Sequence, residues 1–139
     1  MTFPAEITIT EVGPRDGLQN EPEALAVADK IRFIDQLSQC GLREIEATAC
    51  VSPRWVPQLA DAMDVLAGIE RRPGVTYSAL VPNLEGWQRA RDAGVDKIAV
   101  FTAASETFST RNTNASITET LDRFAPVVRA AHDEHRPVR

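Results

Sequence analysis

The spacing of apolar residues along the chain switches repeatedly between the period of two typical of a strand and the period of about 3.6 typical of a helix. Ile7, Ile9 and Val12 predict a short first strand that runs into Gly13 and Pro14. Apolar runs predict three further strands, at residues 42–48, 75–81 and 97–101. The pattern is typical of an α/β chain.

Helical spacing separates these strands. A first helix is predicted around Val27 and Leu37 and closed by Gly41, and a second over residues 59–69. Asn83 is a predicted N-cap for a third helix, which ends before Gly94. Residues 105–115 predict a polar loop. Ser116 and Glu119 then predict a capping box for a long helix, and residues 137–139 resemble the approach to a fifth strand that is not reached.

Four βα units in strict alternation predict parallel strands with right-handed crossovers. Two folds fit this order. A doubly wound sheet would be complete near this length, whereas a (β/α)₈ TIM barrel needs about 250 residues, so the chain would form roughly half of one. Composition does not choose between them.

Composition narrows the classes of partner. The 139 residues carry a net charge of -5 with a pI near 5.0, and no segment gathers the Lys and Arg that nucleic-acid binding requires. No apolar run is long enough to span a membrane, and residues 1–9 do not resemble a secretion signal. Cys40 and Cys50 are not at metal-binding spacing. We therefore expect a cytoplasmic protein.

In either fold, functional residues collect just beyond the carboxyl ends of the strands. Asp16 follows the first strand and is a hard oxygen ligand suited to Mg²⁺ or Mn²⁺. Arg15 offers a guanidinium for a carboxylate or an enolate oxygen. Taken alone, however, this dipeptide is more simply a solvated turn pair.

Two carboxylates lie within predicted strands. Glu46 stands between Ile45 and Ala47, where an unpaired charge would be costly, so it needs either an Arg partner or a chemical task. Glu11 has the same ambiguity. Sequence alone leaves both alternatives open.

Other candidates favour ordinary structural roles. We expect His132 and His135 to be surface residues at the end of a helix and not metal ligands, because no third ligand accompanies them. We expect both cysteines to be small core residues and not nucleophiles, because no histidine lies near either in sequence. We expect the aromatic side chains to be packing residues; these are Trp55, Trp87 and Phe108.

Five segments, in order along the chain, resemble the 3-hydroxy-3-methylglutaryl-CoA lyases. They are EVGPRDGLQNE at 11–21, IEAT at 45–48, VSPRWVPQ at 51–58, VPNL at 81–84 and FTAASETF at 101–108. The resemblance implies a TIM-barrel metallolyase, with residues 1–139 forming its N-terminal part and ending before the fifth strand.

The resemblance also implies the chemistry. Such lyases cleave 3-hydroxy-3-methylglutaryl-CoA to acetyl-CoA and acetoacetate with Mg²⁺ or Mn²⁺, in leucine breakdown. By position, Asp16 would be a metal ligand, Arg15 would bind substrate and stabilise the enolate, and Glu46 would assist catalysis. Gln19 would contact substrate, and Glu11 would support the loop. The full-length protein would act on an acyl-CoA, bind neither nucleic acid nor membrane, and form a homo-oligomer.

The sequence departs from the family pattern in two respects. Where the family usually has Glu-Thr-Thr-Ser-Phe, residues 46–50 read EATAC, which suggests a missing hydroxyl near the cavity and leaves relatives acting on other hydroxyacyl-CoA substrates open. The family's His-x-His motif, later Asn ligand and loop cysteine have no counterpart in residues 1–139.

These absences predict that the chain alone has no measurable lyase activity. A non-catalytic half-barrel that self-associates or complements a second half is the alternative of another class. A condensing synthase is the alternative within enzymes. Synthases of this group usually open with Asp-x-Thr-x-Arg-Asp-Gly, which residues 10–17 do not match.

Overall fold

The computed structural model describes residues 3–139. Its centre is one parallel sheet in the order β1-β2-β3-β4. The strands are β1 (Thr10–Glu11), β2 (Glu44–Ala49), β3 (Thr76–Leu80) and β4 (Lys97–Ala99). Parallel pairing in chain order is the arrangement of a TIM barrel and differs from the strand orders of doubly wound sheets, so the barrel that the resemblance implied is confirmed.

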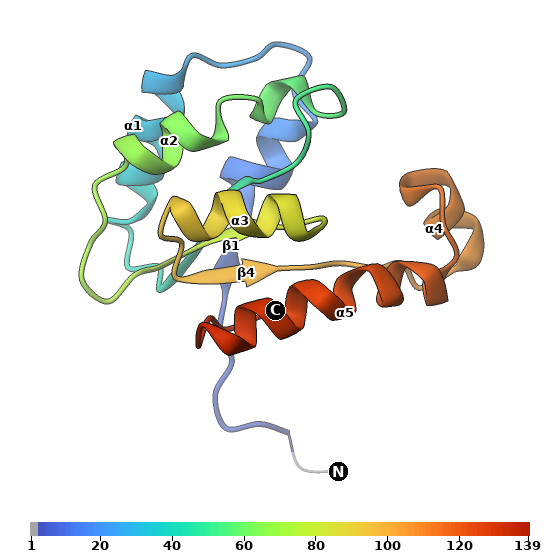
Figure 1. Ribbon diagram of the computed structural model, residues 1–139. Coiled ribbons are helices and arrows are strands. Elements are labelled where there is room, and N and C mark those ends of the chain that lie inside the picture. Colours follow the sequence, from blue (N-terminus) through green and yellow to red (C-terminus); the bar gives the residue numbers. More distant parts are fainter. Residues whose placement is uncertain (1–2) are drawn as a thin grey trace.

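The first strand is shorter than its apolar pattern predicted. Ile7 and Ile9 lie outside β1 and are 80% and 67% exposed. Pairing with β2 begins only at Thr10, opposite Glu44. In Figure 1 the segment before β1 extends away from the rest of the fold, which is why the alternating apolar side chains there find no partner.

Helices cover one face of the sheet. They are α1 (Val27–Leu37), α2 (Ala62–Gly68), α3 (Leu84–Asp92) and α5 (Ile117–Asp133), with α4 (Glu106–Thr113) packed on the end of α5. Two short turns complete the set, a π-helical turn η1 (Gly13–Gly17) and a 3₁₀ turn η2 (Pro57–Leu59). Figure 1 shows α5 running along β4 toward α4.

Strand register separates an apolar outer face from a polar inner face. The outer face packs on the helices through a core that includes Ile45, Tyr77 and Ile98. On the inner face, Glu46 pairs in register with Ser78. Two residues earlier in β2, Glu44 accepts hydrogen bonds from Thr10 Oγ1 and Lys97 Nζ. Charged groups therefore concentrate on the side that the described helices leave uncovered.

A register shift in β2 changes the inner face near the strand end. The irregularity falls between Glu46 and Thr48, after which Ala49 pairs with Leu80. Ala49, Leu80 and Ala99 form a second apolar cluster with Leu59 from η2. The segment after β2 therefore folds over the upper end of the inner face.

One connection differs from prediction. Residues 105–115 were expected to be a polar loop, but α4 lies within them, with Ser105 capping it by accepting from Phe108 N. Residues 137–139 lie alongside β4, where Val138 makes an isolated parallel bridge to Ile98 and Arg139 N donates to Ile98 O. The capping box of Ser116 and Glu119 on α5 is confirmed.

Across residues 3–139, none of the helices has the length and apolar character required to cross a bilayer.

Candidate functional site

The turn η1 carries the polar residues that follow β1. Pro14 is buried and fixes the start of the turn, while Asp16 N donates to Val12 O at 2.7 Å. Glu11 Oε1 accepts from Gly13 N at 2.6 Å, so the last residue of β1 holds the first residue of η1. This tight turn brings the Arg15 side chain to β2.

Arg15 joins two of the three carboxylates that the sequence singled out, Glu46 and Asp16. Its Nε donates to Glu46 Oε1, and its Nη1 donates to Asp16 Oδ1 at 2.8 Å. The Glu46 side chain is fully buried and that of Arg15 is 17% exposed, whereas Asp16 is 56% exposed. The three residues lie together as expected, and burial of their side chains increases from Asp16 to Glu46.

A fourth residue completes the cluster, and the sequence analysis missed it. Arg139 Nη2 donates to Glu46 Oε2, so each oxygen of the buried carboxylate faces one guanidinium. Two features of the sequence pointed to such a residue. Burying Glu46 is costly without a cationic partner, and an Arg stands directly after the apolar Val138. Because Arg139 is far from Glu46 in the sequence, the pattern did not show which arginine would be the partner.

Asp16 fits the role of a metal ligand in part. It is an exposed, hard carboxylate at the strand-end rim, and only its Oδ1 is engaged among residues 3–139. In that same range, no group of three or more His, Cys, Asp or Glu side chains is arranged to hold an ion. Asp16 therefore supplies at most one position of a coordination shell.

The remaining sequence candidates lie around this cluster. Glu11 contacts the start of η1, as described above. Gln19 is half-buried just beyond η1, and within the described residues no hydrogen bond joins it to Arg15, Asp16 or Glu46. Asn20 instead braces the turn, donating from Nδ2 to Asp16 O at 2.7 Å.

The departures from the family pattern at residues 46–50 fall on both faces of β2. Ala47 belongs to the outer core with Ile34 and Val65, so the hydroxyl missing there does not face the inner side of the sheet. Of the altered positions, Ala49 lies on the inner face, packed with Leu80.

The two cysteines differ. Cys50 is buried as expected, and burial raises the pKa of its thiol to about 11 despite the nearby positive charge of Arg89. The expectation that Cys40 is a core residue is wrong. It is exposed in the turn after α1, where its Sγ donates to Gln36 O.

The three aromatic residues differ in burial. Trp87 is buried in the outer core, as predicted. The expectation for the other two is wrong, because Trp55 is 86% exposed and Phe108 is also exposed. Trp55 lies in the segment that follows β2, where it lines a cavity.

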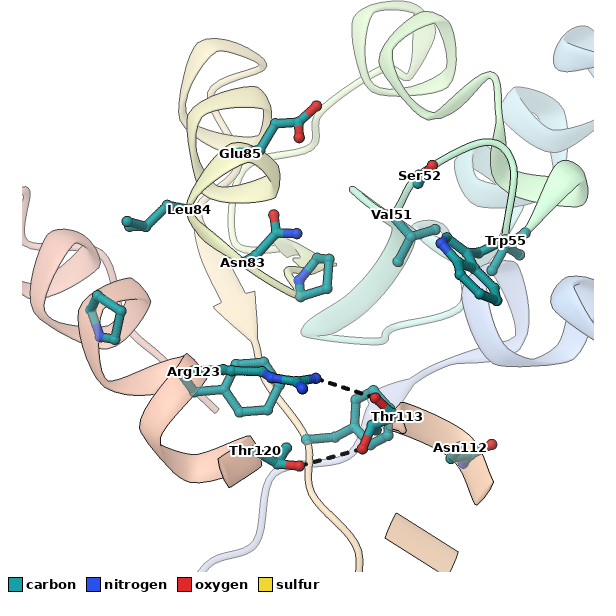
Figure 2. Close-up of a pocket in the computed structure, with 15 residues that line it drawn as sticks. Val51, Ser52, Trp55, Asn83, Leu84, Glu85, Asn112, Thr113, Thr120 and Arg123 are labelled. Atoms are coloured by element: carbon teal, nitrogen blue, oxygen red, sulfur yellow. Dashed lines mark hydrogen bonds between the residues drawn. The ribbon is translucent and has the colours of Figure 1, made fainter. Parts of the chain in front are cut away.

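That cavity has a volume of about 760 Å³ and opens at the same strand ends as the charged cluster. Figure 2 shows Val51 and Trp55 on one side, with Thr113 and Arg123 from the α4–α5 hairpin across from them. Arg123 Nη1 donates to Thr113 O at 3.2 Å. A small molecule reaching Arg15 along this rim would pass the cavity.

The chain is similar to known lyases. The family model described as HMGL-like matches residues 6–139. The 3-hydroxy-3-isohexenylglutaryl-CoA/hydroxy-methylglutaryl-CoA lyase of Pseudomonas aeruginosa is 55% identical over 139 residues, which are 100% of this chain and 46% of that protein. The mitochondrial hydroxymethylglutaryl-CoA lyase of Gallus gallus is 53% identical over 137 residues, covering 99% and 46%. The cytoplasmic 3-hydroxy-3-methylglutaryl-CoA lyase of Rattus norvegicus is 54% identical over 137 residues, covering 99% and 40%.

Solved structures agree. The hydroxymethylglutaryl-CoA lyase of Pseudomonas aeruginosa superposes with a TM-score of 0.92 at 54% identity, covering 99% of this chain and 46% of that one. The HMG-CoA lyase of Acinetobacter baumannii, in complex with coenzyme A and 3-methylmalate, gives 0.88 at 34% identity, covering 94% and 43%. The four-stranded sheet matches the N-terminal half of the TIM barrel of such lyases. The chain spans about half the length of the curated relatives it matches.

Proposed function

The chain belongs to the HMGL-like family, and on that basis we propose that it forms the N-terminal part of a lyase that cleaves 3-hydroxy-3-methylglutaryl-CoA to acetyl-CoA and acetoacetate. The observation that carries the proposal is the Arg15 guanidinium, held by Glu46 and Asp16 at the strand-end rim. The expected setting is leucine breakdown in the cytoplasm, with the full-length protein a homo-oligomer.

The reaction defines what the site must stabilise. As the substrate hydroxyl loses its proton, its oxygen forms the ketone of acetoacetate and the bond between C2 and C3 breaks. The electron pair moves onto the thioester as an enolate, which takes a proton at C2 to give acetyl-CoA. Negative charge therefore collects on the thioester oxygen, where a fixed positive donor lowers the barrier most.

Arg15 is the residue proposed to meet that oxygen. A guanidinium has five N–H donors, and the bonds to Glu46 and Asp16 use Nε and Nη1. Among residues 3–139, Nη2 makes no hydrogen bond, which leaves it available for a ligand. Because the buried Glu46 holds the planar group in place, little reorganisation is needed when the enolate charge develops.

Glu46 is proposed to act through this orientation. Its second oxygen, Oε2, also accepts from Arg139 and so connects β2 to the segment after α5. Gln19, half-buried next to η1, is the proposed contact to substrate polar groups. Glu11 is proposed to support the turn through Gly13 N.

A divalent ion, Mg²⁺ or Mn²⁺, is part of the proposal. Asp16 would hold it, and the remaining ligands would come from outside the described residues. When bound, such an ion supplies Lewis-acid polarisation of the substrate oxygens. The chain's own contribution is to hold the Asp16 carboxylate exposed beside Arg15.

A chimera tests the proposal. The 139-residue chain would replace the matching segment of the Pseudomonas aeruginosa lyase, and acetoacetate and acetyl-CoA would be measured with Mg²⁺ or Mn²⁺. We expect turnover by the chimera and none by the chain alone. A folded chimera without turnover would contradict the proposal, and condensation in place of cleavage would favour the synthase alternative.

The exposed Ile7 and Ile9 beside the short β1 edge favour one further candidate role, a half-barrel that associates with another chain. Light scattering of the 139-residue chain tests this. A monomer at all concentrations would argue against self-association.

A further inference from the structure

Lys30 is an unusual core residue, because it carries a charge, lies on α1 and is only 4% exposed. Its Nζ donates to Gln58 O and to both carboxylate oxygens of Asp61, the latter at 2.7 Å. An ammonium group has three N–H donors, so these three acceptors use all of them. Lys30 therefore fixes the chain around η2 and the start of α2 relative to α1, which lies beside α2 in Figure 1.

Stability alone gives no reason for an ion pair at this place. Asp61 stands at the N-cap of α2, yet its carboxylate makes no capping hydrogen bond to the helix. Both of its oxygens face Lys30 instead. Apolar side chains of similar volume in place of a buried ion pair often leave a protein equally stable or more stable. What apolar side chains cannot do is hold a polar partner such as Gln58 O in one position.

The bond to Gln58 O extends this network to the loop after β1. Gln58 Nε2 donates to Glu21 O at 3.2 Å, although the two residues are 37 positions apart. Next to Glu21, Asn20 Nδ2 donates to Asp16 O at 2.7 Å. A path of hydrogen bonds through neighbouring residues therefore leads from the buried ammonium of Lys30 to the backbone of the proposed metal ligand.

Few hydrogen bonds hold this part of the loop. Residues 20–26 are exposed and form neither helix nor strand. Among residues 3–139, the bond from Gln58 is the one hydrogen bond that joins residues 20–26 to a distant segment. Exposed segments with few contacts open at a low cost in free energy. Asp16 is itself exposed, and in the described part of the chain its carboxylate is bound only by Arg15, so its position depends on how firmly the loop is held.

We propose that Lys30 and Asp61 form a positioning pair that holds the Asp16 carboxylate in place through Gln58 and Glu21. The inference rests on the proposed function for the role of Asp16 as a metal ligand. The pair touches neither substrate nor metal. It orients a ligand from outside the coordination shell, as hydrogen-bonded partners of metal ligands commonly do.

Amide hydrogen exchange of the 139-residue chain tests the path without any need for turnover. In Lys30→Met/Asp61→Leu, the amides of residues 16–21 should exchange about five- to tenfold faster, the factor expected for the loss of one hydrogen bond. The amides of α5 should be unchanged, and the melting temperature should not fall. Faster exchange throughout the chain, with a lower melting temperature, would show a merely structural pair and overturn the proposal.

Gln58→Ala isolates the path, because it removes the donor to Glu21 O and leaves the backbone acceptor for Lys30 in place. It should speed the exchange of the same amides to the same extent as the double variant. Arg32→Gln/Asp29→Asn, which removes an exposed ion pair of α1, is the matched control and should leave these amides unchanged. Unchanged exchange in Gln58→Ala would mean that the path does not exist.

The chimera gives a second readout, the Mg²⁺ requirement of turnover. Lys30→Met/Asp61→Leu should raise the Mg²⁺ concentration for half-maximal rate about tenfold, the lower end of the effect of removing a partner of a metal ligand. Loss of folded protein alone would lower the maximal rate and leave this concentration unchanged. The Arg32→Gln/Asp29→Asn control should match the parent.

The outcomes separate the two proposals. If the chimera turns over and the double variant keeps the Mg²⁺ requirement of the parent, the positioning proposal is wrong and the lyase proposal stands. If the chimera is folded but inactive, the lyase proposal fails, and hydrogen exchange in the chain alone decides whether the pair holds the turn.

Discussion

Arg15 Nε donates directly to Glu46 Oε1, although the two residues are 31 positions apart in the sequence. One follows β1 in the turn η1 and the other lies in the middle of β2. The parallel pairing of the two strands brings them together, and the buried carboxylate then fixes the guanidinium. This contact connects the fold to the proposed chemistry.

Replacing Glu46 with Gln should destabilise the chain, because two guanidiniums would then face each other without the buried carboxylate. Breaking a buried pair costs about 3–5 kcal/mol, and partial exposure of both arginines reduces the expected loss to about 2 kcal/mol. Urea unfolding measures it. The exposed Glu23→Gln is the control, and equal midpoints for the two variants would contradict the account.

Gly86→Ala should also destabilise, for a steric reason. A Cβ at Gly86 would lie 2.6 Å from Cys50 O and 2.8 Å from Pro82 Cδ, so α3 would have to move away from β2. Overpacking of this kind costs about 1–3 kcal/mol. Gly17→Ala, where a Cβ meets nothing within 4 Å, is the matched control for thermal unfolding. If both variants melted together, the close approach of α3 would be wrong.

Glu44 should contribute a pH-dependent term to stability. Burial raises its pKa, but hydrogen bonds from Lys97 and Thr10 outweigh burial, and the net pKa is lowered. A lowered folded-state pKa gives stability that is present above the unfolded value, about 4.3, and lost as pH falls through the folded value. The stability difference between wild type and Glu44→Gln should therefore be constant from pH 7 to 5 and shrink below about pH 4. A constant difference down to pH 3 would refute it.

The two thiols should react at different rates. Cys40 is exposed, whereas Cys50 is buried with a pKa of about 11, so little Cys50 thiolate forms at neutral or mildly basic pH. Ellman's reagent should label one thiol rapidly and the second only on addition of denaturant. In Cys40→Ser the rapid phase should disappear; its survival would place Cys50 at the surface.

The sequence pattern predicted the four strands, their parallel direction and the helices flanking them, because these depend on local periodicity and on a general rule for βα units. The strand order of a barrel followed from the family resemblance. The pattern failed where tertiary context decides. The polar segment containing α4 lacks an apolar period, and its helix depends on the cap at Ser105 and on packing against α5.

The site was also predictable only in part. Strand ends placed Arg15, Asp16 and Glu46 on one rim, and the cost of burying Glu46 predicted a cationic partner. The second partner, Arg139, could not be identified, because it depends on the pairing of residues 137–139 with β4. The inward or outward direction of Ala47 could not be read either, since the register shift in β2 falls beside it.

The most direct measurement of the central claim is the kcat of the chimera carrying Arg15→Gln, assayed with 3-hydroxy-3-methylglutaryl-CoA and Mg²⁺. Loss of a preorganised donor to the enolate oxygen should lower kcat by about 10²- to 10³-fold. Arg32→Gln, an exposed arginine on α1, should retain full turnover. An Arg15→Gln chimera with kcat within about twofold of the parent, where the account requires the full loss, would contradict the claim that this guanidinium stabilises the reacting charge.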